Sequence, residues 1–515
     1  MADTATGSPT LHSSVHERAM SRLPSSRWLP IVGWTALVLA AASVVMLPAG
    51  WLTVALAGMA TVGLAMDRRL GWLPAGLLVT IALPFGRGAD WMPWTVGGYP
   101  VRPPDLAIGI ALVGASLALL RDRSAIRDRL LPPGTAAFVA ATAVLLLVGV
   151  AALAGGVFGD QAMRDVLRDA RWWGLYLAAP LAVLGGTGRA SLLRALLFGS
   201  TVLAIVVLAT AIGPAIEGGL KFSALTYDRG TLRMQFGNSI FLVPAVAYAA
   251  HATLRRYAPW RLGWLALLFC AQVLTLTRTS LLVTGLVVLI VLAGFVLGRR
   301  NLGIYRAATW WPIAAMVLAL VVGFSGAIAT SKLGTPSSWK VDDGAGLSAK
   351  PEDPFDRITF GDDRSGLTVI IGSVATGGRF ATYLNAMRLI VDVPVLGSGF
   401  GQLVDVRFAY NQSRAYTLGK QPGVDNAYLT VALKAGALGV AAFGAVLLLP
   451  VVAAIRRRRR ALLGWFVAGW LGILALTMTQ SFAVGGYAPL GVALVSSLPF
   501  IGYARTSRSA AAAQR

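Results

Sequence analysis

Apolar runs separated by short polar gaps recur along most of the chain. An α-helix needs about 20 predominantly apolar residues to cross the hydrocarbon core of a bilayer. The pattern therefore predicts an all-α protein, a polytopic transmembrane helix bundle. We place about fourteen spans, near residues 28–47, 49–66, 70–85, 105–120, 135–157, 172–188, 194–216, 237–254, 262–277, 280–298, 308–329, 425–453, 462–482 and 486–503.

The spans divide the chain into five parts. These are a polar tail (1–27), spans one to eleven (28–329), a long connection (330–424), spans twelve to fourteen (425–503) and a second tail (504–515). A connection as long as 330–424 is usually functional or disordered.

The long connection changes character along its length. Its first half is rich in Ser, Gly, Pro and charge, which indicates a loosely held segment. Its second half carries Phe380, Leu384 and Met387 at helical spacing. This spacing predicts an amphipathic helix lying on the membrane surface.

Charge placement sets the expected orientation. The chain has a net charge of +23, yet only 13% of its residues are charged, against about 25% in globular proteins. The arginines cluster in alternate gaps, at residues 67–69, 121–129, 255–261, 299–306 and 456–460. This is the positive-inside pattern, which puts both termini in the cytoplasm and residues 330–424 outside. It also argues against nucleic acid as a partner, because the charge follows the topology.

Charged side chains on the outer side are few, and those at the membrane lip are candidate site residues. Five arginines are selected: Arg168, Arg171, Arg278, Arg379 and Arg388. Guanidinium groups bind phosphate oxygens bidentately and stay charged, so this set suits a diphosphate. Two simpler interpretations stay open: pairing of the 164–171 arginines with Asp165 and Asp169, and an interfacial anchor role for Arg278.

The remaining candidate groups are a lysine and a carboxylate of the twelfth span. Lys434 either reaches the interface, packs against a carboxylate or contacts lipid phosphate. Asp425 and Asn426 begin the span, where Asp and Asn are also preferred helix caps. Capping and chemistry are therefore both open for this pair.

Metal and cofactor sites are not expected. Cys270 is the single cysteine, and His12, His16 and His251 all fall on the cytoplasmic side of the expected topology. Without an outward histidine, a carboxylate is left as the side chain for any proton transfer on the outer face.

Three motifs give the chain a resemblance to a known family. They are "TRTSLL" at 277–282, "GGRFATYLNAMRLIVDVPVLGSGFGQ" at 377–402 with its P-x-x-G-x-G-x-G turn, and "DNAYLTVALKAGALG" at 425–439. In this order they resemble the O-antigen ligase/polymerase superfamily, membrane enzymes that move glycans from polyprenyl diphosphate carriers.

The resemblance implies a glycosyltransferase of cell-surface polysaccharide assembly in the bacterial cytoplasmic membrane, with its active site facing outside. Its partners would be a polyprenyl-diphosphate-linked glycan donor, a glycan or lipid-glycan acceptor and membrane lipid, with no cofactor. Arg278 and Arg379 match the family's arginines, and Asn426 and Tyr428 are expected at the substrate. Asp425 would accept a proton from the attacking hydroxyl or orient it. Ligases typically carry His there, so Asp favours a polymerase or another glycan transferase.

Other function classes remain as alternatives. A lipid-linked glycan flippase or exporter would share the many spans and basic residues, but the long one-sided connection and the lack of a repeat count against it. A transferase using polyprenyl-phosphate sugars is disfavoured, because the first outward turn, 47–50, has no carboxylate. A purely structural membrane protein is the third alternative.

Overall fold

The structure is a computed structural model, and it describes only part of the chain. The described residues are 28–46, 50–67, 69–83, 95–96, 99–100, 102–130, 132–159, 161–217, 225–228, 231–234, 239–255, 258–274, 278–300, 379–409, 416–456, 464–479 and 487–501. The expected eleventh span (308–329), the first half of the long connection and both tails lie outside these residues.

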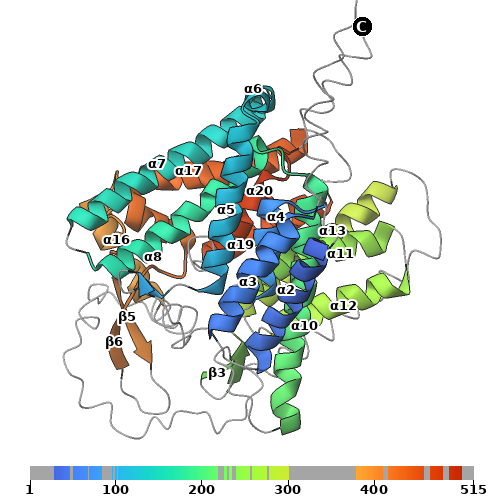
Figure 1. The fold of residues 1–515 in the computed structure, drawn as a ribbon. Helices are drawn as coiled ribbons and strands as arrows, with labels where there is room; N and C mark the ends of the chain where they lie inside the picture. The colour runs from blue at the N-terminus through green and yellow to red at the C-terminus, as the bar shows by residue number, and fades with distance from the viewer. Residues whose placement is uncertain are drawn as a thin grey trace, which may run out of the picture.

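Within this part the chain is a helical bundle (Figure 1). The N-terminal half contains α2 (Trp28–Met46), α3 (Gly50–Ala65), α4 (Trp72–Ala82), α5 (Pro103–Arg121), α6 (Ser124–Leu130), α7 (Pro133–Phe158), α8 (Met163–Gly174), η1 (Leu175–Leu177), α9 (Ala178–Leu184) and α10 (Arg189–Glu217). The C-terminal half contains η2 (Ser239–Phe241), α11 (Leu242–Arg255), α12 (Pro259–Leu274), α13 (Arg278–Arg300), α16 (Arg379–Asp392), α17 (Ala427–Arg456), α19 (Trp465–Thr479) and α20 (Ala488–Ser497).

Several of these helices are membrane-span material. Four are long and apolar enough to cross a bilayer: Pro103–Arg121, Gly134–Phe158, Arg189–Ala209 and Ala427–Arg456. Shorter apolar helices accompany them, including Trp72–Ala82 and Trp465–Met478. The prediction of a helical membrane protein is confirmed at this level.

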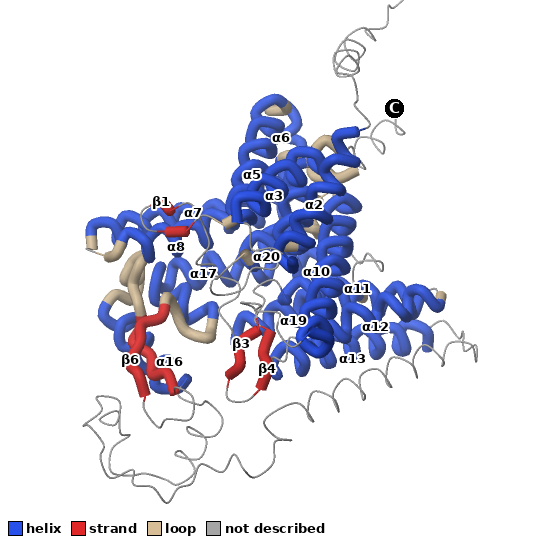
Figure 2. The backbone as a smooth tube through the Cα atoms, turned by 60° about the horizontal axis from the view of Figure 1, so that its bottom comes forward, coloured by secondary structure: helices blue, strands red, loops and turns tan. Residues whose placement is uncertain are grey.

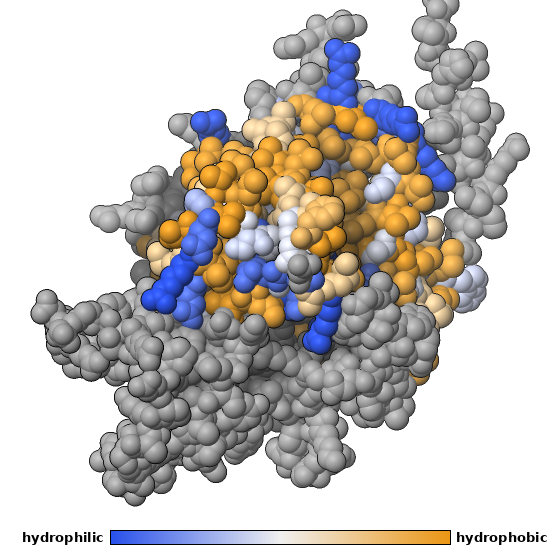
Figure 3. Space-filling view, turned by 90° about the vertical axis from the view of Figure 1, so that its left-hand side faces the viewer, coloured by the Kyte–Doolittle hydropathy of each residue, from blue (hydrophilic) through white to orange (hydrophobic). Residues whose placement is uncertain are grey.

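The outer surface of the bundle supports the same conclusion. Figure 3 shows a broad hydrophobic surface on the side of α7 and α17, with hydrophilic side chains toward its margins. Leu147 and Val150 of α7 are 68% and 62% exposed, and Leu448 of α17 is 57% exposed. Large exposed apolar patches mark interaction or membrane surfaces, so this side of the bundle suits lipid.

The sixth expected span is displaced from its predicted place. Helical backbone begins at Met163 in α8, passes through the 3₁₀ turn η1 and ends at Leu184 in α9, instead of covering 172–188. Gly185 and Gly186 follow, and Gly186 has a φ of 69°. A glycine in this conformation commonly ends a helix, which explains the early stop. The first part of this segment is the charged, amphipathic helix α8, and the second part is the apolar helix α9.

Among the described residues, three two-stranded antiparallel hairpins interrupt the helices, and the sequence pattern did not predict them. They are β1–β2 (Thr95–Val96 with Tyr99–Pro100), β3–β4 (Leu225–Asp228 with Thr231–Met234) and β5–β6 (Val404–Ala409 with Tyr416–Gln421). Figure 1 places β3 and the β5–β6 hairpin at one end of the bundle and α6 at the other, and Figure 2 agrees. The segments expected outside therefore lie opposite the Arg-rich gap 121–129.

The amphipathic helix predicted in the long connection is α16, and one side of it packs on a small protein core. Ala386 is fully buried in a small second core with Val404, Val424 and Leu433. Met387, expected on the apolar face, is 51% exposed. This small core lies between α16, β5 and α17. The spacing of apolar residues in the sequence could not tell a lipid-facing side chain from a protein-facing one.

Candidate active site

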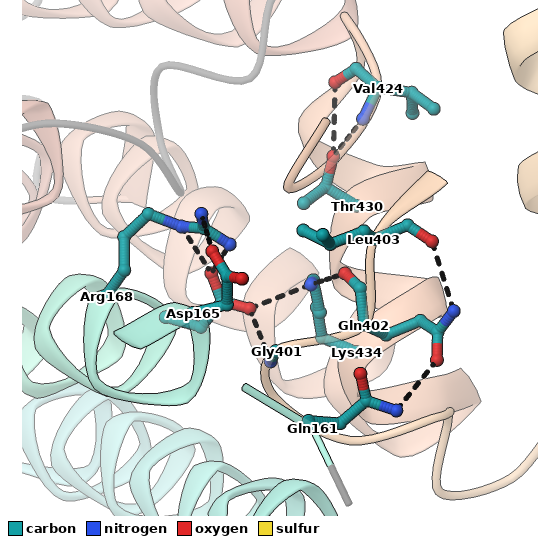
Figure 4. Close-up of polar contacts among 10 residues, drawn as sticks. Gln161, Asp165, Arg168, Gly401, Gln402, Leu403, Val424, Thr430 and Lys434 are labelled. Atoms are coloured by element: carbon teal, nitrogen blue, oxygen red, sulfur yellow. Dashed lines mark hydrogen bonds and ion pairs between the residues drawn. The ribbon is translucent and has the colours of Figure 1, made fainter. Parts of the chain in front are cut away.

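The entrance of α17 is built around Asn426. Its side-chain oxygen accepts the backbone N–H of Leu429 at 3.0 Å, the geometry of a helix N-cap, and its amide donates to the carbonyl of Met478 at 3.0 Å. The Thr430 hydroxyl lies 3.1 Å from both the nitrogen and the oxygen of Val424, which fixes the preceding turn (Figure 4). Asn426 therefore caps this helix, and both ends of its amide are engaged.

Asp425 lies half-buried just before this cap. Its backbone carbonyl accepts the Tyr383 hydroxyl of α16 at 3.1 Å. Because Asn426 supplies the cap, capping does not require the Asp425 carboxylate. The structure thus assigns the cap to Asn426, and a chemical role for Asp425 stays a prediction. The Tyr383 hydrogen bond ties α16 directly to the entrance.

Two turns further on, α17 is broken at Gly436. This residue has φ 62° and ψ −161°, a region that is essentially restricted to glycine. The break frees backbone groups on both sides, and such groups must find partners in an apolar environment. A turn of the connecting segment, residues 394–401, lies against the break. We call it the glycine turn.

The glycine turn supplies the missing backbone partners. Ser398 and Gly399 donate their N–H groups to the carbonyls of Leu433 and Lys434, at 2.7 and 3.1 Å. On the far side of the break, Ala437 donates to the carbonyl of Pro394 at 2.8 Å, and Leu438 donates to Val395 at 3.4 Å. The break is therefore satisfied by protein backbone, and the turn and the helix form one unit.

The turn also packs closely on α7. Phe400 donates its N–H to the carbonyl of Ala152 at 2.8 Å, and its ring lies 5.5 Å from that of Trp173. Gly399 has a φ of 83°, and a Cβ at this position would lie 2.7 Å from the backbone nitrogen of Gly156. Only glycine fits such a contact, which gives the P-x-x-G-x-G-x-G pattern a physical reason.

A buried ion pair joins this unit to α8. Lys434 of α17 places its Nζ 2.7 Å from Oδ2 of Asp169, and each residue is 1% exposed. Oδ2 of Asp169 also accepts the N–H of Gly401 at 2.9 Å, and Lys434 Nζ donates to the carbonyl of Gln402. Of the three roles open for Lys434, packing against a carboxylate is the one the structure adopts.

The predicted arginines of α8 lie in ion pairs. Arg168 pairs with Asp165 and with Asp169, the latter at 3.3 Å. Arg171 places Nη1 2.9 Å from Oδ1 of Asp105, and its guanidinium lies 4.8 Å from the ring centre of Tyr487. The predicted pairing with Asp165 and Asp169 is therefore found for Arg168, whereas Arg171 pairs with a different carboxylate, Asp105 of α5. Substrate binding by both arginines stays a prediction.

The other predicted site residues are spread over three helices. Arg278 is the first residue of α13, and Arg379 is the first residue of α16. Arg388 is exposed on α16. Tyr428 is half-buried in the first turn of α17, with its ring 5.5 Å from that of Phe443. The structure brings Asp425, Asn426 and Tyr428 together at one helix entrance and connects α16 to it through Tyr383.

Sequence reasoning missed two features of this site. One is Asp169 as the partner of Lys434, although a lone lysine in an apolar span signals a buried carboxylate somewhere. The other is the break at Gly436, which lies in the motif 425–439, where the apolar pattern predicts a continuous helix.

Comparison with known proteins bears on this region. Residues 263–444 match the family model described as O-Antigen ligase. The matched region contains Arg278, the glycine turn, Asp425 and the break at Gly436. No curated protein matches the chain.

The break at Gly436 predicts an unequal response of two glycines in one helix. Gly436→Ala should lower the free energy of unfolding by about 1–3 kcal/mol from backbone strain alone. In addition, its Cβ would overlap the backbone of Val395. Gly444→Ala is the matched control, since nothing lies within 4 Å of its Cβ position. Thermal unfolding in detergent should place Gly444→Ala at or above the wild type. Equal stability of the two variants would mean that α17 is not broken.

Proposed function

The chain carries an O-antigen ligase domain at residues 263–444, and from this premise we propose its reaction. A glycan is transferred or polymerised from a polyprenyl-diphosphate donor onto an acceptor hydroxyl, at the outer face of the cytoplasmic membrane. O-antigen ligase-type glycan transfer in polysaccharide assembly follows from the domain. The observation that supports the finer proposal is that all three candidate catalytic residues, Asp425, Arg278 and Arg379, lie within it.

The chemistry is a substitution at the anomeric carbon. The acceptor oxygen forms a bond to this carbon while the bond to the diphosphate oxygen breaks, and the polyprenyl diphosphate leaves with the bonding electrons. The acceptor proton passes to the Asp425 carboxylate and then to water. Arg278 and Arg379 balance the charge that develops on the departing diphosphate. Permanent guanidinium charges make a metal ion unnecessary for that step.

The placement of α16 suits a lipid-linked donor. The exposed side chains of this helix include Met387 at 51% and Val391 at 74%, next to the exposed Arg388. An amphipathic helix of this kind lies in the membrane interface. The polyprenyl chain would remain in the bilayer while its diphosphate meets arginines at the surface.

Orientation is the first part of the proposal to test. The positive-inside pattern puts α6 in the cytoplasm and the β5–β6 hairpin outside. In a Cys270→Ala background, an impermeant thiol reagent added to intact cells should label Met163→Cys, which is exposed at the start of α8 on the expected outer side, and leave the exposed Arg127→Cys in α6 unlabelled. Permeabilised cells should label both. Labelling of Arg127→Cys in intact cells would reverse the proposed orientation.

Arg278 should act through its fork of hydrogen-bond donors as well as its charge. Arg278→Ala should reduce kcat by about 10²–10³, the usual effect of removing one group that stabilises developing charge. Arg278→Lys should retain part of the rate, because the charge stays while bidentate binding is lost. Glycan transfer is measured in membranes at matched protein levels. Unchanged transfer by Arg278→Ala would leave only the interfacial anchor role.

The proposed chemical role of Asp425 and the capping role of Asn426 can be tested separately. Asp425→Asn should lower turnover by about 10²–10⁴, the range for a lost acid–base group, with unchanged thermal stability. Asn426→Ala should lower the free energy of unfolding by about 1 kcal/mol, because it removes the cap. Asp425→His should retain part of the transfer activity. Normal turnover by Asp425→Asn would exclude the carboxylate from the reaction.

The reaction itself is tested with the purified protein. Incubation with a polyprenyl-diphosphate oligosaccharide and an acceptor glycan should release polyprenyl diphosphate in amounts equal to the glycosidic bonds formed. A metal chelator should leave the rate unchanged. A protein that moves the donor across vesicle membranes without forming a glycosidic bond would instead be a flippase.

A further inference from the structure

The Asp169–Lys434 pair is the most deeply buried charged group among the described residues. Removing two charges from water is expensive, and a buried ion pair is therefore weak evidence for stability. Apolar side chains of similar volume often replace such pairs at no cost in stability. The presence of this pair calls for a role other than holding the bundle together.

The second hydrogen bonds of the pair indicate that role. Asp169 accepts the N–H of Gly401. Lys434 donates to the carbonyl of Gln402 (Figure 4), so the two charges hold consecutive residues of the chain. The arrangement has a fixed polarity, because the anion faces an N–H group and the cation faces a carbonyl. An uncharged pair could not match both groups as strongly, since charge-assisted hydrogen bonds are about twice as strong as neutral ones.

The residues held by the pair join the parts of the proposed site. The glycine turn follows α16, which begins with Arg379, and precedes the β5–β6 hairpin, which leads to Asp425. Tyr383 of α16 donates to the carbonyl of Asp425, which closes the loop between them. On the other side, Asp169 belongs to α8, and its Oδ2 contacts both Lys434 and Gly401, so α8 meets this loop at the ion pair.

We propose that Asp169 and Lys434 are positioning residues of the glycan-transfer site. They hold the glycine turn against α8 and so fix α16 and the entrance of α17 in the arrangement that turnover needs. The inference rests on the proposed function, and it adds two residues that do not touch substrate. Because they act through other groups, their loss lowers kcat and leaves donor binding almost unchanged.

Two variants separate positioning from simple stabilisation. Asp169→Asn leaves the Lys434 charge buried without its counter-ion, so both the melting temperature and kcat should fall, kcat by about 10²-fold, the scale of a misplaced catalytic group. The double variant Asp169→Asn, Lys434→Met has no buried charge. Its melting temperature should recover, while kcat stays low. The KM for the lipid-linked donor should stay within about threefold of the wild type, a much smaller change than the fall in kcat.

An exposed ion pair at the opposite end of the bundle gives the matched control. Arg129 and Asp122 lie 2.9 Å apart in the α6 region, and the Asp122 side chain is 52% exposed. Asp122→Asn should leave kcat, KM and melting temperature unchanged, because surface pairs contribute little.

A measurement that does not depend on activity completes the test. Spin labels at two exposed positions, Met163→Cys in α8 and Leu396→Cys in the glycine turn, report the distance between the two parts in a Cys270→Ala background. The distance distribution should be narrow with the native pair and broad in the double variant.

Three results would overturn the positioning role: recovery of kcat together with melting temperature in the double variant, failure of both to recover, or an unchanged distance distribution. A wild-type protein that transfers no glycan would overturn the proposed function instead, and the distance measurement would still decide whether the pair holds the turn.

Discussion

A helix in an apolar environment can be interrupted only where its freed N–H and C=O groups find other partners. In α17 the interruption at Gly436 frees groups on both sides, and the glycine turn satisfies them from Pro394 to Gly399. Arg379 and Asp425 are attached to this join through the chain, since α16 precedes the turn and the β5–β6 hairpin follows it, whereas Arg278 lies apart on α13. Broken helices often expose their termini to ions or substrates. Here backbone occupies those positions, and the chemistry that we propose lies instead at the helix entrance, at Asp425.

The close fit of the join explains why the motif residues are small. Gly399 approaches the backbone of α7, and Gly436 approaches that of Val395. A side chain at either place would push the turn away from the helix and leave the backbone groups at the break without hydrogen-bond partners. Backbone hydrogen bonding and steric contact thus reinforce each other, and neither would suffice alone.

The sequence predicted the helices from apolar run length, and α5, α7, α10 and α17 lie close to their expected places. It did not predict the early end of α9, where Gly186 has a positive φ. It also did not predict the protein core under α16, because composition cannot distinguish lipid from protein as the neighbour of an apolar side chain. For the site, the resemblance selected the helix starts at Arg278 and Arg379 and the entrance at Asp425. The ion pair between Asp169 and Lys434 could not be predicted, since pairing across a long sequence separation depends on the tertiary fold.

The division of charges within the site follows from these contacts. Asp165, Arg168, Asp169 and Lys434 form a balanced set, with two positive and two negative groups in mutual contact. A balanced set attracts a diphosphate weakly, because each guanidinium or ammonium already has a carboxylate. In the reaction that we propose, charge neutralisation of the leaving diphosphate would therefore fall to arginines outside this set, and the buried charges would hold the geometry of the site. Such a separation would let the rigid part of the site stay the same while the charge on the proposed donor changes.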